Sequence, residues 1–158
     1  LVLENSREAQ VPLGKDLEAL QLYMDLERLR SSEAFEHHID VGPGIDPTCV
    51  MVPPLAIQPF VENAILHGLA KKEGKGHLRV SVRRRLEHLL ITVEDDGVGM
   101  KRSSPQTDGC EQTSLGTIIT AERLAMLSEK LGSHFGFRYV DVAQGVCVEL
   151  TLPSTEGV

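Results

Sequence analysis

Two runs of alternating apolar and polar residues constrain the fold most. Residues 77–85 and residues 89–95 each place an aliphatic side chain at every second position. These positions are Leu78, Val80, Val82, Leu89, Ile91 and Val93. Alternation with a period of two is typical of strands that are buried on one face. Because only three residues separate the runs, they predict an antiparallel hairpin whose apolar face another layer must cover.

One segment with a helical period would cover this face. In residues 53–70, apolar side chains recur at i, i+1, i+4, i+5, i+8 and i+9, which forms a single stripe along a helix. The stripe consists of Phe60, Val61, Ala64, Ile65, Gly68 and Leu69. We expect this helix to begin at Pro53 and Pro54, since the first helical residues need no N–H partner.

Residues 14–31 predict a second helix, and its apolar side chains fall into two stripes. One stripe contains Leu13, Leu17, Leu20 and Met24. The nearly opposite stripe contains Leu22, Leu26 and Leu29. A surface helix normally has a single stripe. The second stripe therefore indicates contact with a preceding helix or a second subunit; the alternative is that this chain alone covers both sides.

The remaining segments are shorter. Residues 36–41 predict a strand on which His37 and His38 point to opposite faces, so we expect solvated or edge residues rather than a metal pair. Residues 101–115 predict a lid-like loop, and residues 116–131 predict a helix. Residues 135–152 predict a second hairpin that Pro153 closes, followed by a frayed tail. The one plausible domain boundary lies near residue 32.

Composition excludes several classes of protein. The chain has 158 residues, 41% hydrophobic and 25% charged, which fits one globular domain plus an extra element. Its net charge of −7 argues against nucleic acid as the main partner, because binding a phosphate backbone needs a basic surface. Three dispersed cysteines favour a reducing compartment. No apolar run is long enough to span a membrane. The opening residues, LVLENSREAQ, suggest a fragment of a longer protein.

Asp95 ends the second alternating run in phase with its buried positions. Its carboxylate should therefore point toward the apolar layer, where a charge is costly unless a partner satisfies it. Gly97 and Gly99 follow, and glycine lets a backbone approach a ligand closely. We interpret Asp95 as an acceptor for an exocyclic amine such as that of adenine. The alternative is a strand-end aspartate that accepts backbone N–H groups.

Asn63 and His67 lie one turn apart on the predicted central helix. A carboxamide and an imidazole so placed would hold a hydrated metal–phosphate group; the alternative is a helix with a merely solvated polar face. The lysines of residues 71–75 either reach phosphate or form a solvated charge run. Residues 114–117, at the start of the next predicted helix, are a further candidate for binding phosphate through backbone N–H groups.

Together, the motifs ENAxxHG at residues 62–68 and DxGxG at residues 95–99 resemble the N box and G1 box of the GHKL (Bergerat) ATP-binding domain. With Pro53, Pro54, Gln58 and Pro59, the first motif looks like that of LytS-type sensor histidine kinases. The resemblance covers residues 36–153. It implies a two-layer α/β sandwich, with a mixed, largely antiparallel sheet, helices on one face and a preceding N-terminal helix. Residues 1–35 would be a linker helix from the phosphoacceptor region, and residues 36–158 the catalytic domain.

The resemblance also implies ATP and Mg²⁺ as cofactors. Asn63 would coordinate Mg²⁺ between the phosphates, and Asp95 would accept the adenine amine. The other residues implied to bind the nucleotide are His67, Lys71, Gly97, Gly99, Met100, Ser114, Leu115, Gly116 and Thr117. The γ-phosphoryl group would pass to a histidine of an upstream helical region and then to a response regulator. Because that histidine is absent, we assign no catalytic residue and expect no self-phosphorylation.

Further expectations concern the intact protein and departures from the family pattern. By resemblance it would be a homodimer, with this portion in the cytoplasm and membrane attachment only through N-terminal segments missing here. Leu66 replaces a lysine that many relatives carry. Thr117 ends the glycine motif after the lid, and Val146 replaces a threonine near the adenine pocket. These departures put individual nucleotide contacts in doubt.

Two other functions compete with the kinase interpretation. A GHKL ATPase of the gyrase, Hsp90 or MutL kind would carry a water-activating glutamate four residues before the Mg²⁺ asparagine, and this position is Pro59. Glu62 is adjacent to Asn63 but projects about 100° away from it on a helix. A nucleotide-free interaction module is the second alternative, which the departures favour and which Asn63, Asp95, Gly97 and Gly99 argue against.

Overall fold

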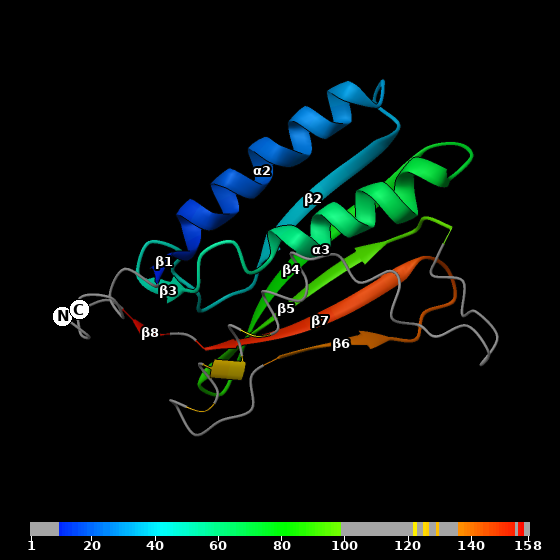
Figure 1. Cartoon of the computed structure of the whole chain (residues 1–158). Coiled ribbons are helices and arrows are strands. Elements are labelled where there is room, and N and C mark those ends of the chain that lie inside the picture. The colour runs from blue at the N-terminus through cyan, green and yellow to red at the C-terminus, as the bar shows by residue number, and fades with distance from the viewer. Residues whose placement is uncertain are drawn as a thin grey trace.

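The computed structural model describes residues 10–98, 122, 125–126, 129, 136–153 and 155–156. Its main sheet has five strands in the order β2-β4-β5-β7-β6. Their bounds are Phe35–Val41 for β2, Gly76–Arg85 for β4, His88–Asp95 for β5, Gly136–Val140 for β6 and Val146–Pro153 for β7. β2 and β4 are parallel, and the other neighbours are antiparallel. With the helices on one side of the sheet (Figure 1), the predicted two-layer fold is confirmed.

The predicted hairpin is β4 and β5. Their register runs from Leu78 opposite Asp95 to Arg85 opposite His88. All six aliphatic positions of the alternating runs are at most 2% exposed, so the predicted buried face is confirmed. β7 pairs with the other edge of β5, where Asp95 lies opposite Val146. β5 is therefore the central strand, and its last residue is flanked by strands on both sides.

Helix α2 (Leu13–Arg30) packs one of its two apolar stripes against the sheet. Leu13, Leu17, Leu20 and Met24 are at most 7% exposed and belong to the same core as the strands. Leu22, Leu26 and Leu29 are 61–69% exposed, so the part of the chain that the structure describes covers only one of the two stripes. The boundary near residue 32 stays a prediction. No helix among the described residues is long and apolar enough to cross a membrane.

β2 is held to α2 by a contact between His37 and Asp25 that the sequence did not predict. His37 Nε2 lies 2.9 Å from Asp25 Oδ1, and the His37 side chain is only 7% exposed. His38 is exposed, and the two histidines point to opposite sides of β2, as predicted. The expectation was for solvated or edge residues: β2 is an edge strand, as expected, whereas His37 is not solvated because α2 covers that side of the strand.

The central helix begins later than predicted. α3 (Gln58–Asn63) continues as a π turn, η1 (Ala64–Gly68), and a 3-10 turn, η2 (Leu69–Lys71). A start at Pro53 was wrong because Leu55 has a φ of +57°, which a right-handed helix excludes. The Leu55 N–H donates instead to Asp16 Oδ1, at 3.0 Å. The predicted apolar stripe of this helix is buried throughout.

A second, three-stranded sheet joins both ends of the described chain in the order β1-β3-β8. β1 is Val11–Pro12, β3 is Val50–Val52 and β8 is Thr155–Glu156. The expected frayed tail was therefore wrong, since β8 pairs with Met51 and Val50.

The predicted loop 101–115 lies outside the described residues. Of the predicted helix 116–131, residues 122, 125, 126 and 129 are described, and they are helical.

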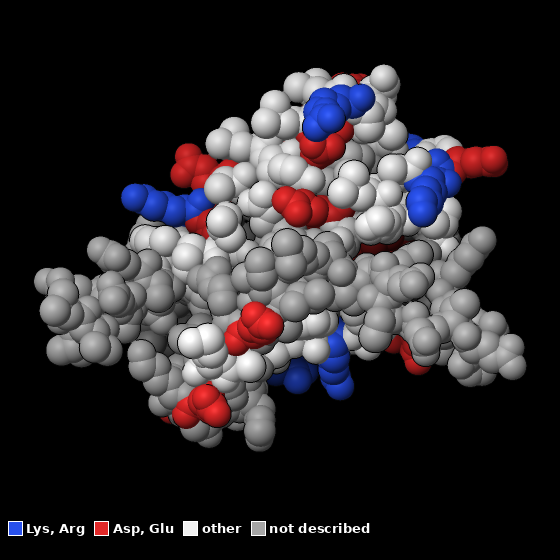
Figure 2. Space-filling model, in the orientation of Figure 1, with Lys and Arg blue, Asp and Glu red and all other residues white. Residues whose placement is uncertain are grey.

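Charged side chains of both signs are interspersed on the face seen in Figure 2. Two pairs of opposite charge join neighbouring strands of the sheet. Arg138 Nη2 lies 2.9 Å from Glu149 Oε2, and Arg83 pairs with Asp40.

Candidate functional site

Asp95 is a buried carboxylate at the C-terminal end of the central strand. It is 3% exposed, and its Oδ1 accepts the Gly97 N–H at 2.9 Å. Burial raises the pKa of Asp95 to about 6; the N–H groups of Gly97 and Val146 oppose this shift, and the neighbouring carboxylates of Asp96 and Glu94 add to it. The predicted inward orientation is confirmed. One oxygen also accepts a backbone N–H, as the alternative interpretation proposed.

Three glycines bring three chain segments against Asp95. A Cβ on Gly68 would lie 2.6 Å from Asp95 Oδ1, and one on Gly97 would overlap the Gly68 carbonyl group. Gly145, with a φ of +78°, presses on the Asp95 carbonyl oxygen, so no side chain fits there. Val98 N–H donates to Gly68 O at 3.3 Å. Helix, strand end and final hairpin therefore meet at backbone contact distance around one carboxylate.

The central helix places Asn63 and His67 in the turns that precede Gly68. Asn63 ends α3 and is partly buried, whereas His67 is exposed in the π turn. π turns inside helices are frequent at functional sites. Because Gly68 contacts Asp95, the same helix carries Asn63 to the side of the sheet on which the Asp95 carboxylate lies. Lys71 is exposed at the end of η2.

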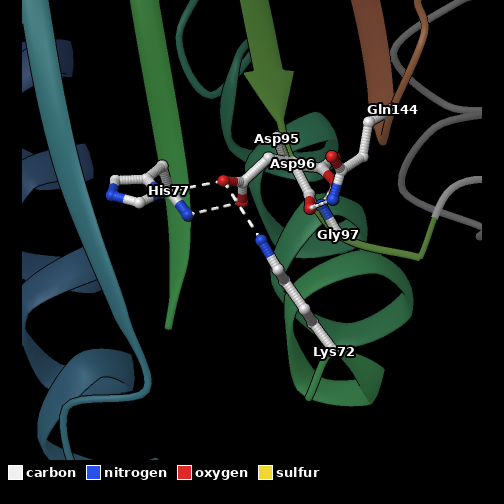
Figure 3. A network of polar contacts seen from close by, with 6 residues as sticks. All are labelled: Lys72, His77, Asp95, Asp96, Gly97 and Gln144. Atoms are coloured by element: carbon white, nitrogen blue, oxygen red, sulfur yellow. Dashed lines mark hydrogen bonds and ion pairs between the residues drawn. The ribbon is translucent and has the colours of Figure 1, made fainter. Parts of the chain in front are cut away.

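A second carboxylate network flanks this cluster (Figure 3). Asp96 Oδ1 accepts the His77 N–H at 2.6 Å, and Asp96 Oδ2 lies 2.8 Å from His77 Nδ1 and 3.2 Å from Lys72 Nζ. Burial would raise the pKa of Asp96, yet the His77 and Lys72 contacts lower it overall. Gln144 Nε2 donates to the Asp96 carbonyl at 3.2 Å. The network fixes the lysine loop and the last hairpin to the end of β5.

Sequence reasoning missed Gly68, Gly145 and Asp96 as parts of the site. The signals were present: Gly68 closes the ENAxxHG motif, Asp96 directly follows Asp95, and Gly145 ends a turn before an alternating strand. Their importance depends on contacts between segments far apart in the chain. The predicted residues Gly99, Met100, Ser114, Leu115, Gly116 and Thr117 lie outside the described residues.

A cavity of about 560 Å³ lies beside the network and includes the Asp95 position. Of the described residues that were predicted to bind the nucleotide, only Asp95 lines this cavity. Its lining residues are Glu36, His37, His38, His77, Leu78, Arg79, Glu94, Asp95, Asp96 and Gln144. Half of these, Glu36, His38, His77, Arg79 and Glu94, are exposed polar residues of β2, β4 and β5. We therefore place the candidate site by its geometry, at Asp95 and the helix that carries Asn63.

Among the described residues, no three His, Cys, Asp or Glu side chains gather to hold a metal ion. Mg²⁺ is usually bound through one or two protein oxygens together with phosphates and water. One amide oxygen, that of Asn63, fits this manner of binding.

Comparison with known proteins identifies relatives of the chain. The family model described as histidine kinase-, DNA gyrase B-, and HSP90-like ATPase matches residues 54–156. The sensor protein LytS of Staphylococcus epidermidis is 31% identical over 136 residues, which are 85% of this chain and 22% of that protein. LytS of Staphylococcus saprophyticus is 30% identical over 96% of this chain and 26% of its own length. The chain thus spans about a quarter of these relatives.

Solved structures share the fold. The histidine kinase domain of a blue-light activated kinase from Erythrobacter litoralis matches with a TM-score of 0.61 and 20% identity, covering 90% of this chain and 61% of that one. The catalytic domain of histidine kinase ThkA matches with a TM-score of 0.63 and 11% identity, covering 93% and 97%. At these identities the likeness establishes the arrangement of strands and helices.

Proposed function

Because the chain belongs to the family of histidine kinase-, DNA gyrase B- and HSP90-like ATPases, we propose that it is the ATP-binding catalytic domain of a sensor histidine kinase. The observation that carries this proposal is the buried Asp95 carboxylate, enclosed by backbone at Gly68, Gly97 and Gly145. In this proposal the γ-phosphoryl group of ATP passes to a histidine of an upstream region, and from there to a response regulator.

Asp95 would recognise adenine through its exocyclic amine. A carboxylate with a pKa of about 6 is roughly nine-tenths ionised at pH 7, so it accepts hydrogen bonds and donates none. Its buried position strengthens a bond to a ligand amine, since water competes little there. Close backbone packing at the three glycines fixes the carboxylate before the ligand arrives, which lowers the ordering cost of binding.

Asn63 would hold Mg²⁺ together with the ATP phosphates. Bound there, the metal would supply neutralisation of the phosphate charge. The protein's part in phosphoryl transfer is then positioning, because little covalent chemistry is required of it. His67 and Lys71 are exposed on the segment that follows Asn63, where cationic or hydrogen-bonding groups would meet the phosphates.

Kinase activity is favoured over hydrolysis by the residues at the start of α3. A general base for water would need a carboxylate one turn before Asn63, and this position is Pro59 in the first turn of the helix. Glu62 Oε1 accepts the Gln58 Nε2 amide at 3.1 Å, which occupies that carboxylate with its own helix. We therefore propose a domain that keeps ATP intact until an acceptor histidine arrives.

The intact protein, by this proposal, is a dimeric bacterial sensor whose ATP-binding portion lies in the cytoplasm. The named relatives are described as sensor proteins, and this chain covers about a quarter of their length. Membrane attachment and the signal-sensing region would belong to other parts of the longer protein.

Calorimetric titration with Mg·ATP tests the proposal. Asp95→Asn keeps the side-chain size but replaces an acceptor oxygen by a donor, so we expect affinity to fall about 10- to 100-fold. Glu94→Gln is the matched control, since it removes one charge from the adjacent, exposed position and should leave affinity within about twofold. If the unmodified chain binds no Mg·ATP at millimolar concentration, the proposal fails and a nucleotide-free interaction module is favoured.

A further inference from the structure

The cavity of about 560 Å³ is built on three successive rows of residues that cross β2, β4 and β5. The middle row is His37, Leu78 and Asp95, whose side chains point toward the helix layer. Because side chains alternate along a strand, the rows on either side point to the opposite face of the sheet, here called the outer face. These two rows are Glu36, His77 and Asp96, and His38, Arg79 and Glu94.

The two outer rows form the walls of the cavity, and the middle row forms its floor. Residues two apart on a strand lie about 6.6 Å from each other, which leaves room for a small organic molecule between the walls. The cavity volume also falls within the range of about 300–1,000 Å³ that is usual for small-molecule sites. Leu78, the one aliphatic lining residue, is 2% exposed. The cavity therefore presents polar groups to a ligand.

The charged groups of the first wall already have partners. Glu36 Oε1 lies 2.9 Å from Lys75 Nζ. The Asp96 carboxylate contacts both His77 and Lys72 (Figure 3). This wall therefore needs no ligand to balance its charges.

The second wall carries charges that are not paired. Arg79 lies directly opposite Glu94 on β5 and beside His38 on β2. Side chains so opposed have Cβ atoms about 4.5–5.5 Å apart, close enough for an ion pair. Within the part of the chain that the structure describes, none of the three side chains makes a hydrogen bond or an ion pair. All three are exposed.

Opposite charges elsewhere on the outer face do pair. Arg83 contacts Asp40 between β4 and β2, and Arg138 Nη2 lies 2.9 Å from Glu149 Oε2 between β6 and β7. The sheet therefore allows ion pairs between its neighbouring strands. The separation of charges in the second wall is a local property of the cavity.

The separated charges indicate the class of ligand. The guanidinium of Arg79 presents a planar set of donors that matches a carboxylate, and the carboxylate of Glu94 accepts from an ammonium group. A phosphate compound would be repelled by Glu94 and Glu36, and a polyamine would be repelled by Arg79. A zwitterion, which carries both charges a short distance apart, bridges the two side chains without either repulsion.

We propose that this cavity is a second ligand site, which binds a free α-amino acid with a polar, uncharged side chain. The carboxylate of the ligand binds Arg79, its ammonium group binds Glu94, and its side chain crosses the floor toward His77 and Gln144. The Nε2 amide of Gln144 already donates to the Asp96 carbonyl, which leaves its Oε1 to accept from the ligand. Because Glu94 and Asp95 are consecutive on β5 and point to opposite faces, the proposal does not depend on nucleotide binding.

An NMR titration of the ¹⁵N-labelled chain with L-glutamine, in the absence of nucleotide, tests the proposal. Two charge-assisted contacts at an exposed site should give a dissociation constant of about 1 mM. We expect the backbone amide resonances of Leu78, Arg79 and Glu94 to shift with one common saturation curve. The amide resonances of Asn63 and His67, on the helix layer, should stay in place.

Two analogues of the probe test the need for both charges. N-acetyl-L-glutamine lacks the ammonium group, and L-glutaminamide lacks the carboxylate. Each should bind about tenfold more weakly than L-glutamine, because each loses one charge-assisted contact.

Matched variants test the assigned side chains. Arg79→Gln and Glu94→Gln should each raise the dissociation constant for L-glutamine about tenfold. Arg85→Gln is the control, since Arg85 is an exposed arginine of the same strand and the same face that does not line the cavity. It should leave the dissociation constant unchanged. Thermal unfolding and Mg·ATP affinity should be the same for all three variants and the unmodified chain.

Three results would overturn the proposal. They are the absence of any shift at about 20 mM L-glutamine, equal binding of the two analogues, and an equal loss of binding in Arg85→Gln and Arg79→Gln. L-Glutamine binding by a chain that does not bind Mg·ATP would support this site and refute the nucleotide proposal alone.

Discussion

Replacing Gly68 by alanine tests whether Gly68 is required for close packing against Asp95 or is an ordinary helical glycine. Gly68 has a φ of −102°, which alanine tolerates, and alanine in a helix interior is favoured over glycine by about 1 kcal/mol. Propensity alone therefore predicts a more stable protein. The structure predicts the opposite, because the added Cβ would lie 2.6 Å from Asp95 Oδ1 and 3.1 Å from its Cγ.

The magnitude follows from how little the surroundings can move. Asp95 is fixed by strands on both sides and by the Gly97 N–H, so the carboxylate cannot move away from the added Cβ without loss of these contacts. Overpacking of this kind costs about 1–3 kcal/mol. After the helix propensity is subtracted, we expect the free energy of unfolding to fall by about 1–2 kcal/mol. ATP affinity should fall about tenfold as the carboxylate is displaced.

Urea denaturation and Mg·ATP calorimetry on Gly68→Ala measure both effects. Gly136→Ala is the matched control, because a Cβ at that glycine meets no atom within 4 Å. It should leave stability and affinity unchanged or improve stability slightly. The reasoning would be refuted by a Gly68→Ala chain that is about 1 kcal/mol more stable and binds ATP as well as before.

Three further predictions concern charge and packing. The pKa of Asp95 is raised to about 6 in the folded chain, so its contribution to stability is greatest below about pH 4 and is lost as the pH rises through 6. We expect the free energy of unfolding to fall by roughly 2–3 kcal/mol over this range. Urea denaturation from pH 4 to 7 should show this fall, and Asp95→Asn should abolish the pH dependence. The pKa of Asp96 is lowered, so Asp96→Asn should reduce the free energy of unfolding by about 1 kcal/mol at pH 7 and by progressively less as the pH falls below 4. An equal reduction at pH 3 would contradict the explanation that the Asp96 carboxylate is stabilised by its contacts with His77 and Lys72. Leu20→Ala, at a side chain 2% exposed, should cost about 2–4 kcal/mol by thermal unfolding; a loss below about 1 kcal/mol would indicate that α2 is a loosely attached linker.

The sequence was sufficient wherever a single segment contains the information. The inward orientation of Asp95 follows from its phase with Leu89, Ile91 and Val93, because side chains alternate strictly along a strand. The two stripes of α2 likewise follow from the helical period alone. Both features depend on spacing within a run of residues, and both are confirmed.

Features that depend on contacts between distant segments were not predictable. The start of α3 moved from Pro53 to Gln58 because Asp16, 39 residues earlier, captures the Leu55 N–H. β1 and β8 have two residues each, and such short strands carry no periodic signal. The tight contacts of Gly68 and Gly145 with Asp95 arise only when the helix and both hairpins have assembled.

The position of Asp95 makes ligand binding a measure of how completely the sheet has formed. The carboxylate lies on the central strand, and the segments that enclose it come from residues 68, 97 and 145. A partly opened sheet therefore has no site, and a ligand that binds only the closed form shifts the opening equilibrium of the whole sheet. Hydrogen exchange at Val80, Val93 and Leu150, on three adjacent strands, should slow by the same factor when nucleotide is added.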